Sequence, residues 1–574
     1  MNEPVRDTVI VGAGPAGLQL AYFLQRAGRD YLVLEGDRVG GFFARYPRHR
    51  RLISINKVHT GRDDVEFNLR HDWNSLLVAD GDEPYPFHGF SREYFPPADR
   101  MVDYLEGFAR RFSLAVRDGF PVVRVGRRDD GVFELESAGG ERLAARRVVV
   151  ATGIGRPFLP DVPGLEYAEG YEDVSVDPDD FTNQAVLILG KGNSAFETAD
   201  ALIPTAATIH LLSPHPLRLA WDSHFVGHLR ACNNNLLDTY QLKSQNAVID
   251  GLLRSVERTP QGKLRVRFSS IHATEEIEQI EYDRIIRCTG FQADLSIFDE
   301  DCRPATVIDG RFPELDGRWQ AVGVPHLYFV GASTQSLDFK RSQSAFIHGF
   351  RYNARTLFHL LEERYHGRPL PSRQVEAEPL AMAREVLRHM SRVSSLWQQV
   401  GFLGDVLVPD DNDFAATWYR DLPPGAIEEM GRGPLRDRRY YVVQFRFGPC
   451  AGSTFDNPRQ ATPYTGELSA QIHPAVARYR GGDLEEEHHV LEDFLADWES
   501  RDYYEPLAAF FAGELDRETG RRQATAAPRV LVRDAAMRLV DEDAPREGEE
   551  AEARESAEPS GAAGGQAGRV GGAA

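Results

Sequence analysis

The chain has 574 residues and a formal net charge of -21, from 87 acidic and 66 basic side chains. Hydrophobic residues make up 42% of the sequence, which is enough for a packed core and excludes wholesale disorder. The acidic balance argues against nucleic-acid binding, because neutralising phosphates needs a basic surface. It argues equally against docking on anionic lipid.

The chain begins with an expected βαβ unit that contains a first glycine-rich motif, GAGPAG. An apolar run at 8–11 precedes the motif, a helical pattern follows it as far as Gly28, and a second strand at 31–34 ends at Glu35. Such glycines permit a tight turn, admit a pyrophosphate close to the backbone and let the helix pack on the strand. The helix N-terminus and a ribose-binding acid complete the pattern. We therefore expect FAD to bind here, through Gly12, Gly14, Pro15, Ala16, Gly17 and Glu35.

A second unit with the same pattern begins at residue 185. A strand at 185–189 leads into GKGNSA, a helix follows, and a further strand at 208–212 ends at Ser213. In both units 23 positions separate the first glycine from the residue that ends the second strand, which is an internal repeat of architecture. Because Ser213 replaces an acid that would repel a 2′-phosphate, and an arginine follows, we expect NADPH in preference to NADH. The expected ligands are Gly190, Gly192, Asn193, Ser194, Ser213 and Arg218.

Three short strands that end in glycine extend this pattern. Two of them, 148–153 and 285–290, bracket the second unit, and the third, 327–331, precedes a helical stretch at 344–363. We interpret the first two as crossing points between an outer domain and an inserted one. The glycines that end the three strands, Gly153, Gly290 and Gly331, are further expected cofactor ligands.

The predicted fold class is α/β, with two nested Rossmann-like dinucleotide-binding domains (FAD and NADP) and a C-terminal α+β extension. Within the extension we expect a strand at 440–447 and a helix at 484–499, on which the neighbouring His488 and His489 point apart and form no metal pair. The tail carries a net charge of -6 and no aromatic residue, so it cannot offset its ordering entropy. The predicted divisions are 1–165 and 285–370 (FAD-binding), 166–284 (inserted, NAD(P)H-binding), 371–540 (extension) and 541–574 (disordered acidic tail).

The four cysteines are Cys232, Cys288, Cys302 and Cys450, and no two form a CxxC pair. This spacing disfavours a disulfide scaffold, a cysteine zinc site and a disulfide reductase with a redox pair beside the flavin. We expect no metal site. The sequence shows no signal peptide and no stretch of about 18 apolar residues, so a cytoplasmic protein without a membrane span is predicted.

Several motifs carry a resemblance to the flavin-containing monooxygenase superfamily. Arg45-Tyr46-Pro47 resembles its flavin-proximal segment, and LISINK at 52–57 resembles the segment that carries an active-site asparagine. The resemblance implies that Arg45 lies near the flavin and that Asn56 is catalytic near flavin C4a. The family fingerprint FxGxxxHxxx(W/Y/F) is not kept: Gly164 is present, but Val162, Ala168 and Glu172 replace the other residues, with Tyr171 beside the last.

A closer resemblance covers most of the chain. The runs RYPRHRRLISINK, EFNLRHDWNSLL, YAEGYEDVSVDPDDF, LGKGNSAFETA and FIHGFRY resemble the FAD-dependent oxidoreductase domain-containing protein 2 family. This resemblance implies the fold and FAD binding, whereas the family's role in the disposal of misfolded proteins is not expected to transfer, because the sequence shows no signal peptide and no KDEL-type ending. His348, in FIHGFRY, is expected at a helix start that faces the flavin, as a further cofactor contact.

The predicted function is that of a FAD-dependent oxidoreductase in which NADPH reduces FAD. We expect a monooxygenase-like enzyme that acts on a small molecule with oxygen. Two alternatives remain open. One is a flavin-bound quality-control factor that binds a protein partner through residues 371–540, and the other is a flavin dehydrogenase or oxidase that inserts no oxygen.

Overall fold

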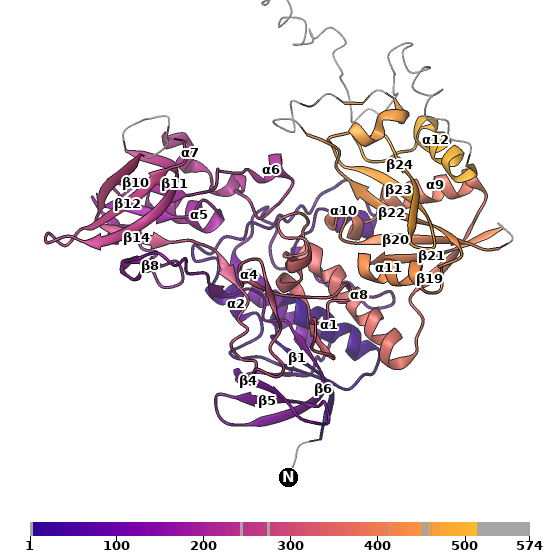
Figure 1. Ribbon diagram of the computed structural model, residues 1–574, viewed down its shortest axis with the longest axis horizontal. Coiled ribbons are helices and arrows are strands. Elements are labelled where there is room, and N and C mark those ends of the chain that lie inside the picture. Colours follow the sequence, from indigo (N-terminus) through magenta and orange to yellow (C-terminus); the bar gives the residue numbers. More distant parts are fainter. Residues whose placement is uncertain are drawn as a thin grey trace, which may run out of the picture. The chain divides into compact units, whose positions relative to one another are not determined.

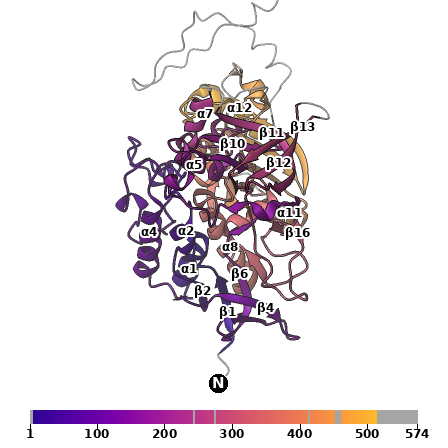
Figure 2. The same cartoon turned by 90° about the vertical axis from the view of Figure 1, so that its left-hand side faces the viewer.

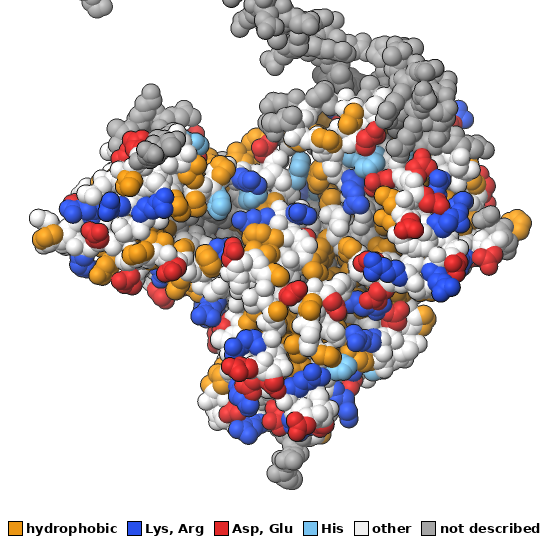
Figure 3. Space-filling model, viewed as in Figure 1, with side chains coloured by type: hydrophobic (Ala, Val, Ile, Leu, Met, Phe, Trp, Pro, Cys, Tyr) orange, Lys and Arg blue, Asp and Glu red, His pale blue; other side chains and the backbone are white. Residues whose placement is uncertain are grey.

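The structure is a computed structural model that describes residues 4–240, 245–272, 276–411, 414–450, 457, 459–460 and 462–513. All of these residues fall within one compact unit, Met1–Ala526. The predicted acidic tail, 541–574, lies outside the described residues. Figure 1 shows the helices and strands in chain order, and Figure 3 shows acidic and basic side chains interspersed over most of one face.

The first sheet contains the first glycine motif. Its order is β3-β2-β1-β6-β5-β4, with β18 paired to β6. The strands β3, β2, β1, β6 and β18 run parallel, and β4 and β5 add an antiparallel edge. Val9, Ile10 and Val33 are fully buried, as expected for parallel strands covered on both faces. The strands are β1 Arg6–Val11, β2 Tyr31–Leu34, β3 Val116–Arg117, β4 Val122–Arg127, β5 Phe133–Ser137, β6 Arg142–Val150 and β18 Leu327–Phe329.

Three long helices accompany this sheet: α1 Pro15–Arg26, α4 Ala98–Arg111 and α8 Ile347–His366. Figure 2 shows α1 and α8 beside β1, β2 and β6. Helix α1 ends where the sequence predicts, because Gly28 adopts the left-handed φ of 65° that stops a helix. The predicted helix at 344–363 begins three residues later, at Ile347.

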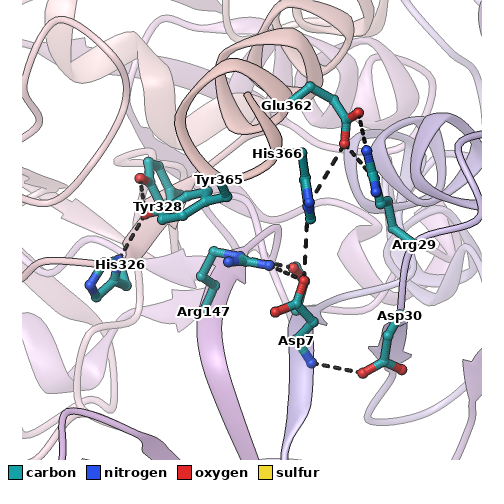
Figure 4. A network of polar contacts seen from close by, with 10 residues as sticks. Asp7, Arg29, Asp30, Arg147, His326, Tyr328, Glu362, Tyr365 and His366 are labelled. Atoms are coloured by element: carbon teal, nitrogen blue, oxygen red, sulfur yellow. Dashed lines mark hydrogen bonds and ion pairs between the residues drawn. The ribbon is translucent and has the colours of Figure 1, made fainter. Parts of the chain in front are cut away.

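A polar network fixes the C-terminal end of α8 to the first sheet (Figure 4). Glu362 accepts hydrogen bonds from Arg29 at 2.7 and 2.6 Å, and His366 lies 3.9 Å from Glu362 and 4.0 Å from Asp7. Nearby, the Tyr365 hydroxyl lies 2.7 Å from that of Tyr328. This clamp joins the last turn of α8 to the loop after α1.

The second sheet contains the second glycine motif, and its order is β13-β12-β11-β10-β9-β14-β8. The strands from β11 to β8 run parallel, while β12 and β13 extend the sheet by antiparallel pairing. Helix α5, Asn193–Leu202, follows β9. The strands are β8 Glu169–Gly170, β9 Ala185–Leu189, β10 Thr208–Ser213, β11 Asn246–Arg258, β12 Leu264–Ser270, β13 Ile277–Tyr282 and β14 Arg284–Arg287.

The third sheet belongs to the C-terminal region and is antiparallel throughout, in the order β19-β21-β20-β22-β23-β24. The two mainly parallel sheets and this α+β region confirm the predicted fold class, while the predicted domain boundaries stay a prediction. Its elements are β19 Ser372–Glu376, α9 Pro379–Met390, α10 Ser395–Gln398, β20 Gly404–Pro409, β21 Ala415–Leu422, α11 Pro424–Arg432, β22 Arg439–Arg446, β23 His473–Arg480, β24 Asp483–His489 and α12 Arg501–Ala512.

The expected helix at 484–499 is wrong, because Asp483–His489 forms β24. The charged run pairs with β23, and Glu486 accepts a hydrogen bond from Arg478 across the two strands at 2.9 Å. These cross-strand partners stabilise the sheet and outweigh the helical spacing of Leu484, Leu491 and Leu495 in the sequence. His488 and His489 do point apart, but as neighbours on a strand.

The shorter elements connect the three sheets, and no helix among the described residues is long and apolar enough to cross a membrane. The remaining elements are α2 Gly41–Arg45, α3 Val65–Asn68, α6 Ala220–Ser223, α7 Asn235–Tyr240, β7 Arg156–Pro157, β15 Phe291–Gln292, β16 Thr306–Val307, β17 Phe312–Pro313, and the 3-10 helices η1 Phe87–Gly89, η2 Leu165–Tyr167, η3 Pro178–Phe181, η4 Ala231–Asn233, η5 Gly331–Leu337 and η7 Pro463–Leu468.

Candidate active site

The first glycine motif forms a tight turn between β1 and α1 whose outer two glycines cannot be replaced without displacing backbone. Gly12 has φ 110°, and a Cβ on it would lie 2.8 Å from the Ala151 carbonyl oxygen. A Cβ on Gly17 would overlap the Gly12 carbonyl oxygen. The Gly12 N–H donates to the Leu34 carbonyl at 2.8 Å, so the turn is tied to both neighbouring strands.

The middle glycine of the motif faces open space. Gly14 is the N-cap of α1, with φ -77° and ψ -178°, and a Cβ on it would meet no heavy atom within 4 Å. A Cβ on Gly331, by contrast, would lie 2.8 Å from the Ala16 Cβ, so η5 closes against the start of α1. A Cβ on Gly153 would also meet nothing within 4 Å. The result is a cradle at a helix N-terminus, where unpaired N–H groups and the helix dipole suit a pyrophosphate.

Glu35 closes the loop in front of this cradle. Its Oε2 accepts a hydrogen bond from the Ala13 N–H at 2.7 Å, and its Oε1 accepts one from the Asp37 N–H at 3.1 Å. Each carboxylate oxygen can accept a second hydrogen bond. The half-buried Glu35 therefore retains acceptor capacity for a ribose hydroxyl while it holds the glycine turn.

The second motif repeats the geometry of the first. Gly190 has φ 125°, its Cβ would overlap the Cys288 carbonyl oxygen, and its N–H donates to the Leu212 carbonyl at 2.8 Å. Gly192 is the N-cap of α5, with φ -89° and ψ -176°, and a Cβ on it would meet nothing within 4 Å. Gly290, with φ 90°, likewise faces open space. The chain thus contains two glycine cradles built in the same way.

Asn193, which follows the second cradle, uses its side chain within the protein. Its Nδ2 donates to the carbonyls of Gly227 and His228 at 3.2 and 2.8 Å, and its Oδ1 accepts from the Arg230 N–H at 3.0 Å. The side chain therefore fixes the segment 227–230 across the start of α5. Its neighbour Ser194 lies in the first turn of the helix.

At the end of β10 the predicted ligands lie on the surface or near it. The half-buried Ser213 accepts a hydrogen bond through Oγ from the His215 N–H at 3.2 Å, and Arg218 is exposed. Lys191, which the sequence reasoning passed over, donates to the Ser213 and His215 carbonyls and forms an ion pair with Asp250. The lysine between the two glycines of the GKG run is the sequence feature that could have identified this residue.

A carboxylic acid that the sequence analysis missed lies beside the second cradle. Glu197, on α5, is 7% exposed and accepts a hydrogen bond from the Tyr171 hydroxyl. Burial raises the pKa of Glu197 to about 7, and the Tyr171 hydrogen bond lowers it in part. Tyr171 stacks on Tyr46 at 5.9 Å and accepts from the Arg48 N–H at 2.9 Å. The pair therefore joins α5 to the segment after α2.

Arg45 and Asn56 differ in their surroundings. Arg45 is the last residue of α2 and is exposed. Asn56 is 3% exposed, and its Nδ2 donates to the Ser91 carbonyl at 2.7 Å and the Glu93 carbonyl at 3.4 Å. Both amide hydrogens of Asn56 are thus directed at backbone carbonyls, which fixes the orientation of the side chain.

His348 lies in the first turn of α8 with neither ring nitrogen hydrogen-bonded to any described residue. It is 1% exposed and stacks on Trp73 with ring centroids 4.2 Å apart, while the Arg230 guanidinium lies 4.9 Å from the Trp73 ring. Burial, and then the charges of Arg351 and Arg230, hold the pKa of His348 well below its usual range. The neutral ring therefore has a buried donor and acceptor available.

Two further polar atoms near this helix are buried without a hydrogen bond among the described residues: Gln335 Nε2 and Ser336 Oγ of η5. Buried polar groups are nearly always paired. Together with His348 they point to a polar ligand between η5 and the start of α8. The residues present therefore fit a flavin whose pyrophosphate lies in the first cradle.

The four cysteines form no disulfide. Cys302 is buried and donates to the Val125 carbonyl, and Cys450 is exposed. Burial raises the pKa of the Cys288 thiol far above its ordinary value. A thiol in such surroundings is a poor nucleophile.

A cavity of about 270 Å³ is lined by Arg156, Gln292, Ala293, Leu295, Ser296, Arg303, Thr306 and Gly310.

The chain is also similar to known proteins. The family model described as pyridine nucleotide-disulphide oxidoreductase matches residues 9–331. The chain is 38% identical to FAD-dependent oxidoreductase domain-containing protein 2 of Mus musculus, over 90% of this chain and 85% of that protein. The protein of the same name from Danio rerio is 35% identical, over 87% of this chain and 82% of its own length.

Among solved structures, a flavin-containing monooxygenase from Stenotrophomonas maltophilia is 20% identical, with a TM-score of 0.48, and covers 63% of this chain and 98% of its own. The match to the two curated relatives extends through the C-terminal region, beyond the part that the family model covers. The chain therefore belongs to the FAD-dependent oxidoreductase domain-containing protein 2 family, within the pyridine nucleotide-disulphide oxidoreductases.

Proposed function

We propose that this protein is a FAD-dependent oxidoreductase in which NADPH reduces FAD, and that it acts as a monooxygenase-like enzyme on a small molecule with oxygen. The observation that carries the proposal is the repeated cradle. The N-caps Gly14 and Gly192 have nearly the same backbone angles and both face open space. Two nucleotide sites in one chain suit electron transfer from a nicotinamide to a flavin.

In this proposal, residues 1–165 and 285–370 form the FAD-binding domain. The N-terminus of α1 meets the pyrophosphate, Glu35 accepts from a ribose hydroxyl, and His348 supplies a neutral donor and acceptor near the ring system. Bound FAD would supply a hydride acceptor that passes electrons to oxygen. No two of the four cysteines form a CxxC pair, and this spacing supports an acceptor other than a cysteine pair.

Residues 166–284 form the nicotinamide-nucleotide domain, with the N-terminus of α5 at the pyrophosphate. Preference for NADPH rests on Arg218, which carries no ion pair among the described residues, and on the absence of an acid at Ser213. Arg218→Ala should raise the KM for NADPH about tenfold or more and leave that for NADH nearly unchanged. Arg267→Ala, an exposed arginine on β12 of the same sheet, is the matched control. An equal loss with both nucleotides contradicts the assignment.

Asn56 is proposed as the catalytic residue. Its amide hydrogens are directed at the Ser91 and Glu93 carbonyls, so the side chain is held in one orientation and only its Oδ1 remains to contact a flavin or a substrate. The decisive experiment supplies ¹⁸O₂ to the FAD-loaded protein with NADPH and a panel of sulfur and nitrogen nucleophiles. Label in an organic product supports oxygenation; hydrogen peroxide as the sole oxygen product contradicts it and favours an oxidase.

A further inference from the structure

The C-terminal region reaches the candidate flavin site through a buried hydrogen-bond network centred on Gln399. This residue directly follows α10 and is fully buried. Its Nε2 donates to Asn353 Oδ1 of α8 at 2.5 Å, and its Oε1 accepts from Ser342 Oγ at 3.2 Å. One glutamine of the C-terminal region thus bonds to two separate segments of the preceding part of the chain.

The first branch of the network leads to the glycine motif. Asn353 Nδ2 donates to Thr334 Oγ1 at 3.5 Å, and Thr334 Oγ1 donates to the Gly331 carbonyl at 2.8 Å. Asn353 and Thr334 are fully buried. Because Gly331 closes against Ala16, Gln399 is connected by successive hydrogen bonds to the first nucleotide cradle.

The second branch holds residues 338–346, which run from η5 to α8 and are called the 338–346 loop below. The Ser344 hydroxyl donates to the buried Asp338 carboxylate, and the single hydroxyl hydrogen of Ser342 is shared between Asp338 and Gln399 Oε1. Burial raises the pKa of Asp338, and the serine hydrogen bonds lower it in part. The Gln343 N–H also donates to the Gln398 carbonyl at 3.3 Å. The C-terminal region therefore holds this loop at two points.

A third contact fixes the C-terminal region to the segment that carries Trp73. Arg70 is 4% exposed and donates through Nε to the Val393 carbonyl at 2.9 Å. Its guanidinium lies 4.3 Å from the Trp397 ring, and its carbonyl accepts from Gln398 Nε2 at 2.9 Å. Because α10 is anchored independently of Gln399, truncating Gln399 removes the network and leaves the docking contacts in place.

We propose that Gln399 is a positioning residue for the flavin, and that the C-terminal region is a working part of the flavin site. In this role the C-terminal region holds the 338–346 loop and η5 in the arrangement that binds the cofactor. The inference rests on the proposed FAD function. A role as a separable partner-binding module alone would not require this internal network. Without Gln399, Asn353 Oδ1 loses its hydrogen-bond donor in a place that water does not reach.

The test uses the full-length protein with and without FAD, and compares Gln399→Ala with the wild type. Lys340 and Arg341 lie in the 338–346 loop, so trypsin reports directly on its order. We expect cleavage after these residues to become about tenfold faster and the Kd for FAD to rise about tenfold. We also expect a shift in the visible absorbance band and reduction potential of bound FAD, which a general loss of stability would not produce.

The matched control is Gln374→Ala, because Gln374 is an exposed glutamine of β19 that bonds to Thr417 Oγ1 at 2.9 Å in the same region. It should leave cleavage, Kd and spectrum unchanged. If Gln399→Ala fails to fold, Gln399→Met decides, since it keeps a side chain of similar size and removes both hydrogen-bonding groups of Gln399. Values for the folded variant within twofold of the Gln374→Ala control overturn the proposal. Failure of the wild type to bind FAD refutes the proposed function instead, and cleavage of the FAD-free protein still tests the loop.

Discussion

A substitution that adds a side chain at Gly14 should weaken cofactor binding without affecting folding. Gly14 is extended, with φ -77° and ψ -178°, a conformation that any L-residue adopts, and a Cβ there meets no protein atom within 4 Å. A valine therefore fits the FAD-free protein, but it fills the space in front of α1 where the pyrophosphate would lie. We expect Gly14→Val to fold normally and to lose FAD.

The two effects differ greatly in size. In the FAD-free protein, a poorer N-cap residue costs about 1 kcal/mol, and the reduced freedom of the unfolded chain returns roughly 0.4–1 kcal/mol. The free energy of unfolding should therefore change by about 0.5 kcal/mol or less. Each hydrogen bond to a charged group contributes about 1.5–3 kcal/mol, so the loss of two phosphate contacts raises the Kd for FAD by about 100-fold or more.

Urea denaturation of the FAD-free protein gives the first quantity, and titration of flavin fluorescence gives the second. Gly17→Ala should show the opposite profile, because its Cβ would overlap the Gly12 carbonyl oxygen and destabilise the FAD-free protein by roughly 1–3 kcal/mol. A Kd for Gly14→Val within threefold of the wild type would refute the assignment of the first cradle. A large loss of stability would refute the geometric reasoning.

Three further predictions concern the second cradle and the buried acids. Gly192→Val should retain FAD and its absorbance but abolish flavin reduction by NADPH, measured anaerobically. The pKa of Glu197 is raised from 4.5 to about 7, so its contribution to the free energy of unfolding is full below pH 4.5 and is lost as the pH rises to 7. Glu197→Gln should remove this decline of about 3 kcal/mol. Urea denaturation at several pH values measures it. Glu362→Ala leaves the half-buried Arg29 without its carboxylate and should lower the free energy of unfolding by about 2–3 kcal/mol, whereas an unchanged urea midpoint contradicts the clamp.

The parts of the site that depend on local geometry were predictable from the sequence. The glycine turns form within a few residues of one another, and the strands that flank them are apolar runs, so the two βαβ units matched the structure closely. The ends of β2 and β9 coincide with the predicted ranges. Spacing alone identified both cradles, because a sharp turn with φ above 100° at Gly12 and Gly190 accepts only glycine comfortably.

The parts that depend on distant contacts were not predictable. Asn193 has the right position for a ligand, but the segment 227–230 occupies its side chain. Glu197 acquires its raised pKa from burial beside Tyr171, which no local pattern reveals. Gln399 bonds to Asn353, 46 positions earlier in the chain. The strand at 483–489 was mistaken for a helix because its stability comes from pairing with β23.

The contact between Gly331 and Ala16 has a consequence for how the protein matures. The first cradle is formed by residues 12–17, yet it stays open until a segment translated about 300 residues later closes against it, and Gln399 is made later still. During synthesis on the ribosome, an N-terminal fragment that already contains GAGPAG lacks the wall that would retain a cofactor. If FAD binds in this cradle as proposed, products that end before Gly331 should therefore bind no FAD and remain colourless.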